Sequence, residues 1–259
     1  VQQAPRRPRR AVDAPPTVVS VLLALPLTVC TVLLVAVPAA IFVVYSFWQD
    51  AANPRGLWRR TTLAEYRKAQ PAWEALPPVE RGQLLRRLAQ LILENRERLA
   101  RLVVAEQGKP LAEARGEIAY AGAFFEWYGE EAKRVYGDTI PAPAGDRRIM
   151  VLKQPVGVVG AITPWNFPSA MITRKVGPGI AAGCTVVLKP SDVSPVSAII
   201  LTEVLEKAGV PKGVFNLVIG KGRVVGEAIC NHSDADMVSF TGSTQAGIKV
   251  GEAAARTVK

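Results

Sequence analysis

The stretch from Gln154 to Asp192 constrains the fold of this 259-residue chain more than any other part of it. Two valine-rich apolar runs, at residues 156–163 and 185–189, are short and bounded by glycine or proline, which is typical of strands buried on both faces. The segment between them, from Pro168 to Gly183, is long enough for a crossover helix. A strand, a helix and a second strand within about thirty residues predict a parallel βαβ unit.

The same alternation continues to the end of the chain. Helices are expected at 195–208, at 223–231 and from Ser243 onward, and strands at 214–219 and 237–241. Strands that alternate with helices across short turns predict a doubly wound, mostly parallel α/β sheet. We therefore expect a Rossmann-like domain of the nucleotide-binding type over residues 147–259, with its last strands missing.

Residues 77–146 are expected to form a helical layer before this sheet. One long helix ends at Gly108 and Pro110, and its apolar residues recur at helical spacing: Leu84, Leu85, Leu88, Leu91, Ile92, Leu99, Leu102 and Val103. A second helix, over 111–137, carries a stripe that we expect to pack in the core: Ile118, Phe124, Phe125 and Trp127. Residues 147–163 then supply two extended runs that are broken at Pro155.

The head of the chain has a different composition. Residues 17–48 form a run of 32 residues without a charge, which predicts one transmembrane helix; a signal peptide or a buried soluble helix fits this length less well. The proline- and arginine-rich arm at 1–16 is expected to be disordered, and 49–76 to hold a linker and a first helix. Basic residues on both sides of the run leave its orientation open. Residues 17–70 also resemble the first span of binding-protein-dependent transport permeases.

Charge and cysteine usage exclude several classes of function. Residues 1–60 carry seven Arg and two Asp, so half of the net charge of +10 lies beside the apolar run, which favours a membrane flank over a nucleic-acid surface. The three cysteines, Cys30, Cys184 and Cys230, are too widely spaced to predict a metal site or a disulfide framework. The single histidine, His232, gives catalytic triads little support, and we expect it at a solvated helix end.

Several strand-to-helix turns are expected to meet at the carboxyl edge of the sheet, where open parallel sheets bind ligands. Gly220 to Gly226 reads GxGxxxG, a weak dinucleotide signal that also fits plain tight turns. Ser243 can either cap the helix that follows or present a free helix N-terminus to a pyrophosphate. Lys189 is either solvated or part of the ligand-binding edge.

Four blocks carry a family resemblance: ITPWNFP (162–168), GPGIAAGCTVVLKPSD (177–192), AGVPKGVFNLV (208–218) and FTGST (240–244). In this order and spacing they resemble the aldehyde dehydrogenase superfamily, from about residue 65 to residue 259. The segments AMITRK (170–175) and RVYGDTIP (134–141) are most similar to the succinate-semialdehyde dehydrogenases within it.

The resemblance implies a role for each matching residue. Asn166 matches the asparagine whose amide donates to the aldehyde oxygen as it becomes an oxyanion, and Lys175 matches a lysine near the active site. Arg174 matches the arginine that holds the distal carboxylate of a semialdehyde, although a helix-surface arginine is the alternative. The implied cofactor contacts are Thr163, Pro164, Trp165, Asn166, Lys189, Pro190, Ser191, Asp192, Gly222, Gly226, Phe240, Gly242 and Ser243.

The resemblance also implies the cofactor and the reaction. Asp192 stands where the family often has a glutamate on the ribose 2′-hydroxyl, so we expect NAD, with NADP as the alternative, and no metal. A thiolate would attack the aldehyde, hydride would pass to NAD, and water would release the acid. None of the three cysteines matches the family's nucleophile, whose motif would follow Lys259, so we expect this chain to be an inactive fragment.

Two alternatives remain beside the enzyme: a membrane-anchored, non-catalytic NAD-binding module, and a permease fragment joined to dehydrogenase sequence. The expected partners are a small-molecule aldehyde, the membrane through residues 17–48 and a second copy of the chain, as in the full-length family; nucleic acid is not expected. The dehydrogenase part is expected in the cytoplasm and the head in a membrane.

Overall fold

The structure is a computed structural model that describes the backbone of residues 57–259 and the side chains from Tyr66 onward. The predicted arm at 1–16 and the predicted membrane span at 17–48 lie outside the described residues, so both stay predictions. Among the helices that are described, none combines the length and the apolar character that crossing a membrane requires.

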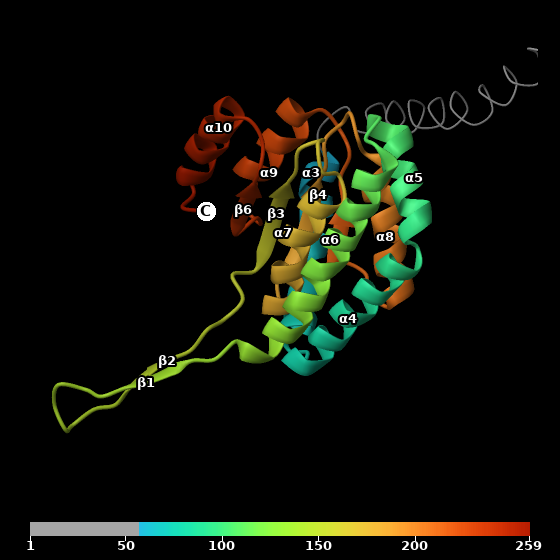
Figure 1. The fold of residues 1–259 in the computed structure, drawn as a ribbon. Coiled ribbons are helices and arrows are strands. Elements are labelled where there is room, and N and C mark those ends of the chain that lie inside the picture. Colours follow the sequence, from blue (N-terminus) through green and yellow to red (C-terminus); the bar gives the residue numbers. More distant parts are fainter. Residues whose placement is uncertain (1–56) are drawn as a thin grey trace, which may run out of the picture. The chain divides into compact units, whose positions relative to one another are not determined.

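A four-stranded parallel sheet forms the centre of the described part (Figure 1). Its order is β5 (Phe215–Leu217), β4 (Thr185–Lys189), β3 (Val158–Ile162) and β6 (Met237–Phe240). Every residue of β3 and β4 is buried, as the two valine-rich runs predicted. In the register of this pair Val158 lies opposite Thr185, and Ile162 lies opposite Lys189.

Helices cover both faces of the sheet, so the predicted doubly wound α/β arrangement is confirmed. On one face, alternate strand residues such as Val159 and Val186 belong to the main core together with α7 (Ala170–Ala182) and α8 (Val196–Ala208). On the other face, Val158 and Val187 pack with Tyr66 of α3 (Leu57–Glu74) and Ile229 of α9 (Glu227–Asn231). The last helix, α10 (Thr244–Ala255), follows β6 and contacts α9.

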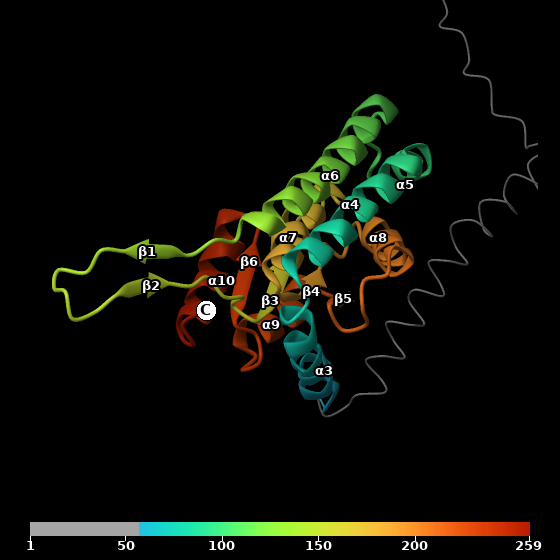
Figure 2. The ribbon, with the colours of Figure 1, turned by 90° about the horizontal axis from the view of Figure 1, so that it is seen from below.

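Outside α7 and α8 lies a second helical layer, built from α4 (Pro78–Glu94), α5 (Arg96–Gln107) and α6 (Leu111–Glu131) (Figure 2). The prediction of one long helix up to Gly108 was wrong, because the helix breaks at Asn95. There the backbone leaves the helical region, with φ −97° and ψ 12°, and the Asn95 side-chain amide donates to the Leu91 carbonyl over 2.8 Å beside the backbone N–H. Gly108 ends α5 in the left-handed conformation, with φ 73°, as expected.

The aromatic stripe of α6 is only partly buried. Ile118 and Phe125 are fully buried, as predicted, whereas Trp127 is 64% exposed, so its assignment to the core was wrong. Trp127 lies two residues beyond Phe125 and therefore points about 200° around the helix, away from α4 and α7. Phe124 is half-buried and stacks at an angle on Tyr120, with 4.5 Å between ring centroids.

Two further elements differ from the expectation in detail. The extended run before Pro155 does not join the sheet; it forms β2 (Ile149–Val151), which pairs antiparallel with β1 (Asp138–Ile140) in a hairpin that projects from the body (Figure 1). The helix expected at 223–231 begins as a π turn over Gly222–Gly226 before it becomes α9. Gly222 and Gly226, the two ends of that turn, have no side chain that could clash with the wider backbone of a π turn.

Candidate functional site

The carboxyl ends of the strands are held level by backbone hydrogen bonds that continue past the strands. Thr163 N–H donates to the Lys189 carbonyl over 3.1 Å, Thr241 N–H to the Ile162 carbonyl over 3.0 Å, and Val218 N–H to the Leu188 carbonyl over 2.8 Å. The turns that follow all four strands therefore start at one edge. From β3 the chain continues to β4 on one side of β3, whereas β6 lies on the other side of β3. The turn after β3 therefore lies at the topological switch point of the sheet.

Lys189, the last residue of β4, places its side chain inside this edge. The residue is only 3% exposed, and no described residue accepts a hydrogen bond from its ammonium. A Cβ added at Gly222 would lie 3.9 Å from Lys189 Nζ, so the glycine turn closes over the lysine. Burial lowers the pKa of Lys189, and the nearby Asp192 carboxylate opposes that shift. The ammonium is thus a donor that lacks an acceptor.

Lys175, on α7, contacts β6, the strand that pairs with β3. Its ammonium donates to Ser239 Oγ of β6 over 2.9 Å. Burial, helped by the positive charge of the neighbouring Arg174, lowers the pKa of Lys175 to about 8. The sequence analysis had singled out Lys175 but not Ser239, because a serine inside a short strand gives no signal of its own.

The turn after β3 presents three exposed side chains at the same edge: Trp165, Asn166 and Phe167. The side-chain amide of Asn166 makes no hydrogen bond within the described residues, so it is available to a ligand. The backbone of the turn is by contrast well anchored, since the Asn166 carbonyl accepts a hydrogen bond from Lys109 Nζ over 3.0 Å.

Comparison with known proteins agrees with this geometry. The profile described as "Aldehyde dehydrogenase family" matches residues 60–259. The chain belongs to the aldehyde dehydrogenase family. This family accounts for the whole described sheet and for the helical layer that precedes it.

Two curated relatives and one solved structure are similar to this aldehyde dehydrogenase chain. A glutarate-semialdehyde dehydrogenase of Pseudomonas aeruginosa is 57% identical over 192 residues, which cover 74% of this chain and 40% of the relative. An NADP(+)-type succinate-semialdehyde dehydrogenase of Escherichia coli is 52% identical over 77% of this chain and 42% of its own length. The crystal structure of succinate-semialdehyde dehydrogenase from Burkholderia pseudomallei superposes with a TM-score of 0.76 at 48% identity, covering 78% of this chain and 42% of that one. The chain thus spans about 40% of the length of the curated relatives.

The aldehyde dehydrogenase chain uses an ion pair at this edge that the sequence analysis missed. Lys109, between α5 and α6, and Glu117, on α6, lie 2.6 Å apart with side-chain exposures of 10% and 0%. Glu117 sits among Ala114, Ile118 and Ala121 on the buried face of α6. A glutamate within an apolar helical stripe is the signal that could have revealed it.

A second carboxylate, which is half-buried, anchors the turn after β4. Glu106, at the end of α5, accepts hydrogen bonds from the backbone N–H of Val196, and from the N–H and Oγ of Ser197 over 3.1 and 2.6 Å. These are the free donors of the first turn of α8, which directly follows the Lys189–Asp192 turn.

The other predicted site residues differ in the contacts that they already make within the protein. Ser243 accepts a hydrogen bond from the Ala246 N–H over 3.3 Å, which confirms the capping interpretation. A Cβ at Gly242 would lie 2.5 Å from Phe240 Cζ, so a larger residue there would displace the Phe240 ring. Arg174 is exposed, with its guanidinium 5.3 Å above the Phe124 ring, and pairs with no carboxylate among the described residues.

Neither thiol in the described part lies at this edge. Cys184 directly precedes β4 and is therefore at the amino end of the strands, while Cys230 lies near the end of α9. Burial raises the pKa of both thiols, which keeps them protonated and unreactive. Among the side chains that the structure describes, from Tyr66 onward, no cluster of His, Cys, Asp and Glu could hold a metal ion.

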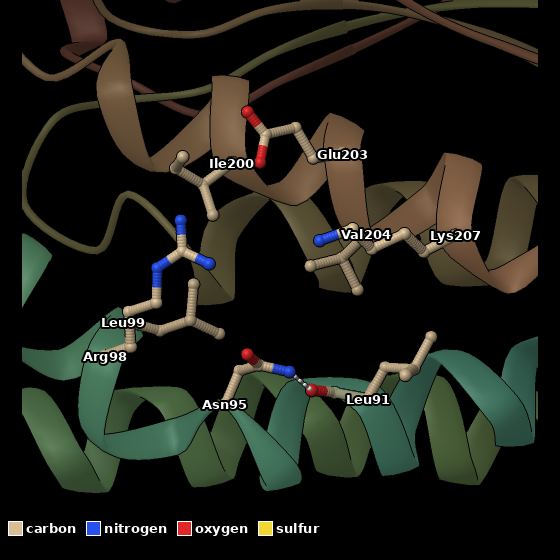
Figure 3. A pocket seen from close by; sticks show the side chains of 8 residues that line it. All are labelled: Leu91, Asn95, Arg98, Leu99, Ile200, Glu203, Val204 and Lys207. Atoms are coloured by element: carbon tan, nitrogen blue, oxygen red, sulfur yellow. Dashed lines mark hydrogen bonds between the residues drawn. The ribbon is translucent and has the colours of Figure 1, made fainter.

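A pocket also exists on the far side of α8, in the groove that α8 shares with α4 and α5 (Figure 3). It is lined by Leu91, Asn95, Arg98, Leu99, Ile200, Glu203, Val204 and Lys207. Its volume of about 20 Å³ has room for about one water molecule, and it includes none of the predicted site residues. It is therefore not a candidate for the dinucleotide or the aldehyde.

Proposed function

We propose that this aldehyde dehydrogenase chain binds a nicotinamide dinucleotide across the carboxyl edge of its sheet and serves the oxidation of an aldehyde to its acid. The observation that carries the proposal is Lys189, a residue only 3% exposed at this edge, whose ammonium has no hydrogen-bond acceptor within the described residues. Beside it, at the end of the adjacent strand, Thr163 Oγ1 is buried without a hydrogen-bond partner. A buried hydroxyl without a partner is costly, and the hydroxyls of a ribose would supply hydrogen-bond partners for both side chains.

The turns around Lys189 supply the remaining contacts of this proposal. Lys189 and Asp192 would hold the adenosine ribose, and the turns that contain Gly222, Gly226 and Gly242 would hold the phosphates. The proposed contact set is Thr163, Pro164, Trp165, Asn166, Lys189, Pro190, Ser191, Asp192, Gly222, Gly226, Phe240, Gly242 and Ser243. Bound there, the nicotinamide ring would accept the hydride that leaves the aldehyde carbon.

The aldehyde end of the site is proposed to depend on Asn166 and Arg174. The exposed Asn166 amide would donate to the aldehyde oxygen as negative charge develops on it, a contact worth about 3–4 kcal/mol of barrier. The exposed Arg174 guanidinium would bind the distal carboxylate of a semialdehyde. The two relatives named for glutarate and succinate semialdehyde support an aldehyde with such a carboxylate.

The covalent step requires a thiolate, and the two described thiols cannot provide it from the amino end of the sheet. We therefore propose that residues 57–259 bind the dinucleotide but do not oxidise aldehydes unaided. The same observation favours the second candidate function, a non-catalytic dinucleotide-binding module.

Self-association is proposed through the β1–β2 hairpin. Its side chains, and those just beyond it, expose apolar surface away from the core, with Met150 at 69% and Leu152 at 71%. An exposed apolar patch on a projecting hairpin is typical of a protein–protein contact.

Calorimetric titration with NAD and NADP tests the proposed function. We expect NAD to bind at least about tenfold more tightly than NADP, because the Asp192 carboxylate repels a 2′-phosphate. Lys189→Met should weaken NAD binding by about tenfold or more, through loss of charge-assisted hydrogen bonds.

Lys212→Met is the matched control, since Lys212 is an exposed lysine just before β5, at the opposite end of the sheet. It should leave the dissociation constant unchanged. Absence of NAD binding to the unmodified chain would refute the proposal, and equal affinity for both dinucleotides would refute the role of Asp192.

A further inference from the structure

The turn that carries Asn166 is held by side chains from a distant part of the chain. We infer that Lys109 and Glu117 are positioning residues, which together fix the backbone of the Trp165–Asn166–Phe167 turn so that the Asn166 amide faces the edge of the sheet. This inference rests on the proposed function for the role of Asn166, although the contacts themselves do not depend on it.

Lys109 binds the turn from one side. Its ammonium donates to the backbone carbonyl of Asn166 over 3.0 Å and lies 3.9 Å from the centroid of the Phe167 ring. Two successive residues of the turn are therefore held by one cation, through a hydrogen bond and a cation–π contact. The Lys109 side chain is only 10% exposed, so water competes little for these contacts.

Glu117 binds the chain just after the turn. One carboxylate oxygen, Oε2, pairs with Lys109 over 2.6 Å. The other, Oε1, accepts hydrogen bonds from the backbone N–H of Ser169 over 2.9 Å and of Ala170 over 3.3 Å. These N–H groups belong to the start of α7, where a negative charge is favoured by the helix dipole.

The Lys109–Glu117 pair thus fixes the backbone at two points, at the carbonyl of Asn166 and, three residues later, at the N–H of Ser169. The preceding carbonyl, that of Trp165, accepts a hydrogen bond from Ser194 Oγ over 3.4 Å. Fixing consecutive carbonyls sets the direction in which the intervening side chain leaves the backbone. Because the Asn166 side chain makes no other hydrogen bond among the described residues, the orientation of its amide depends on these backbone contacts.

A buried ion pair could instead serve only the packing of α6 against α7. The two roles differ in what changes when the pair is removed. Loss of a packing contact lowers stability and leaves the folded turn in place, whereas loss of a positioning contact changes the environment of Trp165 and Asn166 in the folded protein. The adenosine half of the site, at Lys189, should be unaffected in both cases.

Fluorine NMR of the chain labelled with 5-fluorotryptophan distinguishes the two roles. The Trp165 resonance is assigned by its loss in Trp165→Phe. In Lys109→Met and in Glu117→Gln we expect this resonance to shift or broaden, and NAD affinity to fall by about tenfold. Affinity for AMP, which reports on the Lys189 half alone, should change less than about twofold. Lys109→Arg, which retains the positive charge, should restore most of the native resonance.

Arg115→Met is the matched control, because it breaks an exposed α5–α6 ion pair, Arg115–Glu97 at 2.7 Å, that does not reach the turn. It should leave the Trp165 resonance unchanged. An unchanged Trp165 resonance in folded Lys109→Met and Glu117→Gln would overturn the inference. If the Trp165 resonance shifts but the unmodified chain binds neither NAD nor AMP, the positioning contact stands and the proposed function fails.

Discussion

Lys175 and Lys189 are two lysines at one sheet edge whose pKa values are both lowered by burial, but they differ in their partners. Lys175 has the hydroxyl of Ser239 at 2.9 Å, whereas Lys189 has no hydrogen-bond acceptor among the described residues. The Lys175 ammonium therefore has a hydrogen-bond acceptor within the protein, whereas the Lys189 ammonium has none among the described residues. At the scale of single residues, this difference points to Lys189 as the ligand-binding lysine and leaves Lys175 as a titratable neighbour.

The pKa of about 8 for Lys175 predicts that it loses its proton well below exposed lysines. In mass-spectrometric acetylation across a pH series, the rate at Lys175 should reach half its maximum near pH 8, about two pH units below exposed lysines. Ser239→Ala removes an acceptor from the ammonium and should lower this midpoint further.

The same shift has a consequence for stability. Because the folded pKa lies below the unfolded value, the unfolded chain binds more protons between about pH 8 and the ordinary lysine pKa of 10.5. The contribution of Lys175 to stability therefore rises with pH across this window. A midpoint of acetylation equal to that of exposed lysines would contradict both expectations.

Arg174 should discriminate between aldehydes by charge. In calorimetry with the NAD-loaded chain, Arg174→Ala should weaken binding of succinate semialdehyde by roughly tenfold to a hundredfold, since a charge-assisted contact is lost. Binding of butanal, which has no distal carboxylate, should not change. Arg87→Ala, on the exposed surface of α4, is the control. Equal losses for both aldehydes would contradict a carboxylate-binding role.

At the scale of elements, the close approach of α4 and α6 depends on two glycines that face each other. A Cβ at Gly82 would lie 2.5 Å from the Gly129 carbonyl oxygen, and one at Gly129 would lie 3.0 Å from the Gly82 carbonyl oxygen. Gly116, also on α6, has open space around its Cβ position. Gly82 and Gly129 are therefore needed for the packing of α4 against α6, whereas Gly116 is not.

Alanine substitutions should therefore have opposite effects at these sites. Gly82→Ala forces the helices apart and should lower the free energy of unfolding by about 1–3 kcal/mol. Gly116→Ala should raise it by about 0.5–1 kcal/mol, because alanine is the better helix former. Urea unfolding followed by circular dichroism measures both. Destabilisation of similar size at Gly116 would show that packing between α4 and α6 is not the cause.

At the scale of the whole molecule, the β1–β2 hairpin is the element with the least support from its own chain. All six residues of β1 and β2 are exposed. An isolated two-stranded hairpin is marginally stable at best, so we expect a second copy of the chain to cover it.

Sedimentation velocity tests this expectation. Met150→Asp and Leu152→Asp place a charge on the exposed apolar surface of the hairpin and should shift the protein to a smaller species. Val258→Asp is the control, because Val258 is 93% exposed and lies more than 100 positions after the hairpin in the sequence. An unmodified chain that sediments as a monomer at all concentrations would contradict the proposed self-association.

Much of the fold could be predicted because its signals are local. Short valine-rich runs became buried strands, and glycines and prolines marked the turns between elements. The errors arose where a single side chain overrode the periodicity, as at Asn95, or where the angle around a helix decided exposure, as at Trp127. The pairing of residues 138–140 with 149–151 was missed because both strands lie outside the alternating pattern.

The sequence by itself determined the order of strands and helices and the turns that gather at the carboxyl edge, because hydrophobic spacing and turn residues act over a few positions. Only the tertiary structure decided which side chains meet there. Lys175 contacts Ser239 across 64 positions, and Lys109 contacts Asn166 across 57. No local pattern encodes such contacts, since they exist only after α6 and α7 have packed together and the strands have aligned.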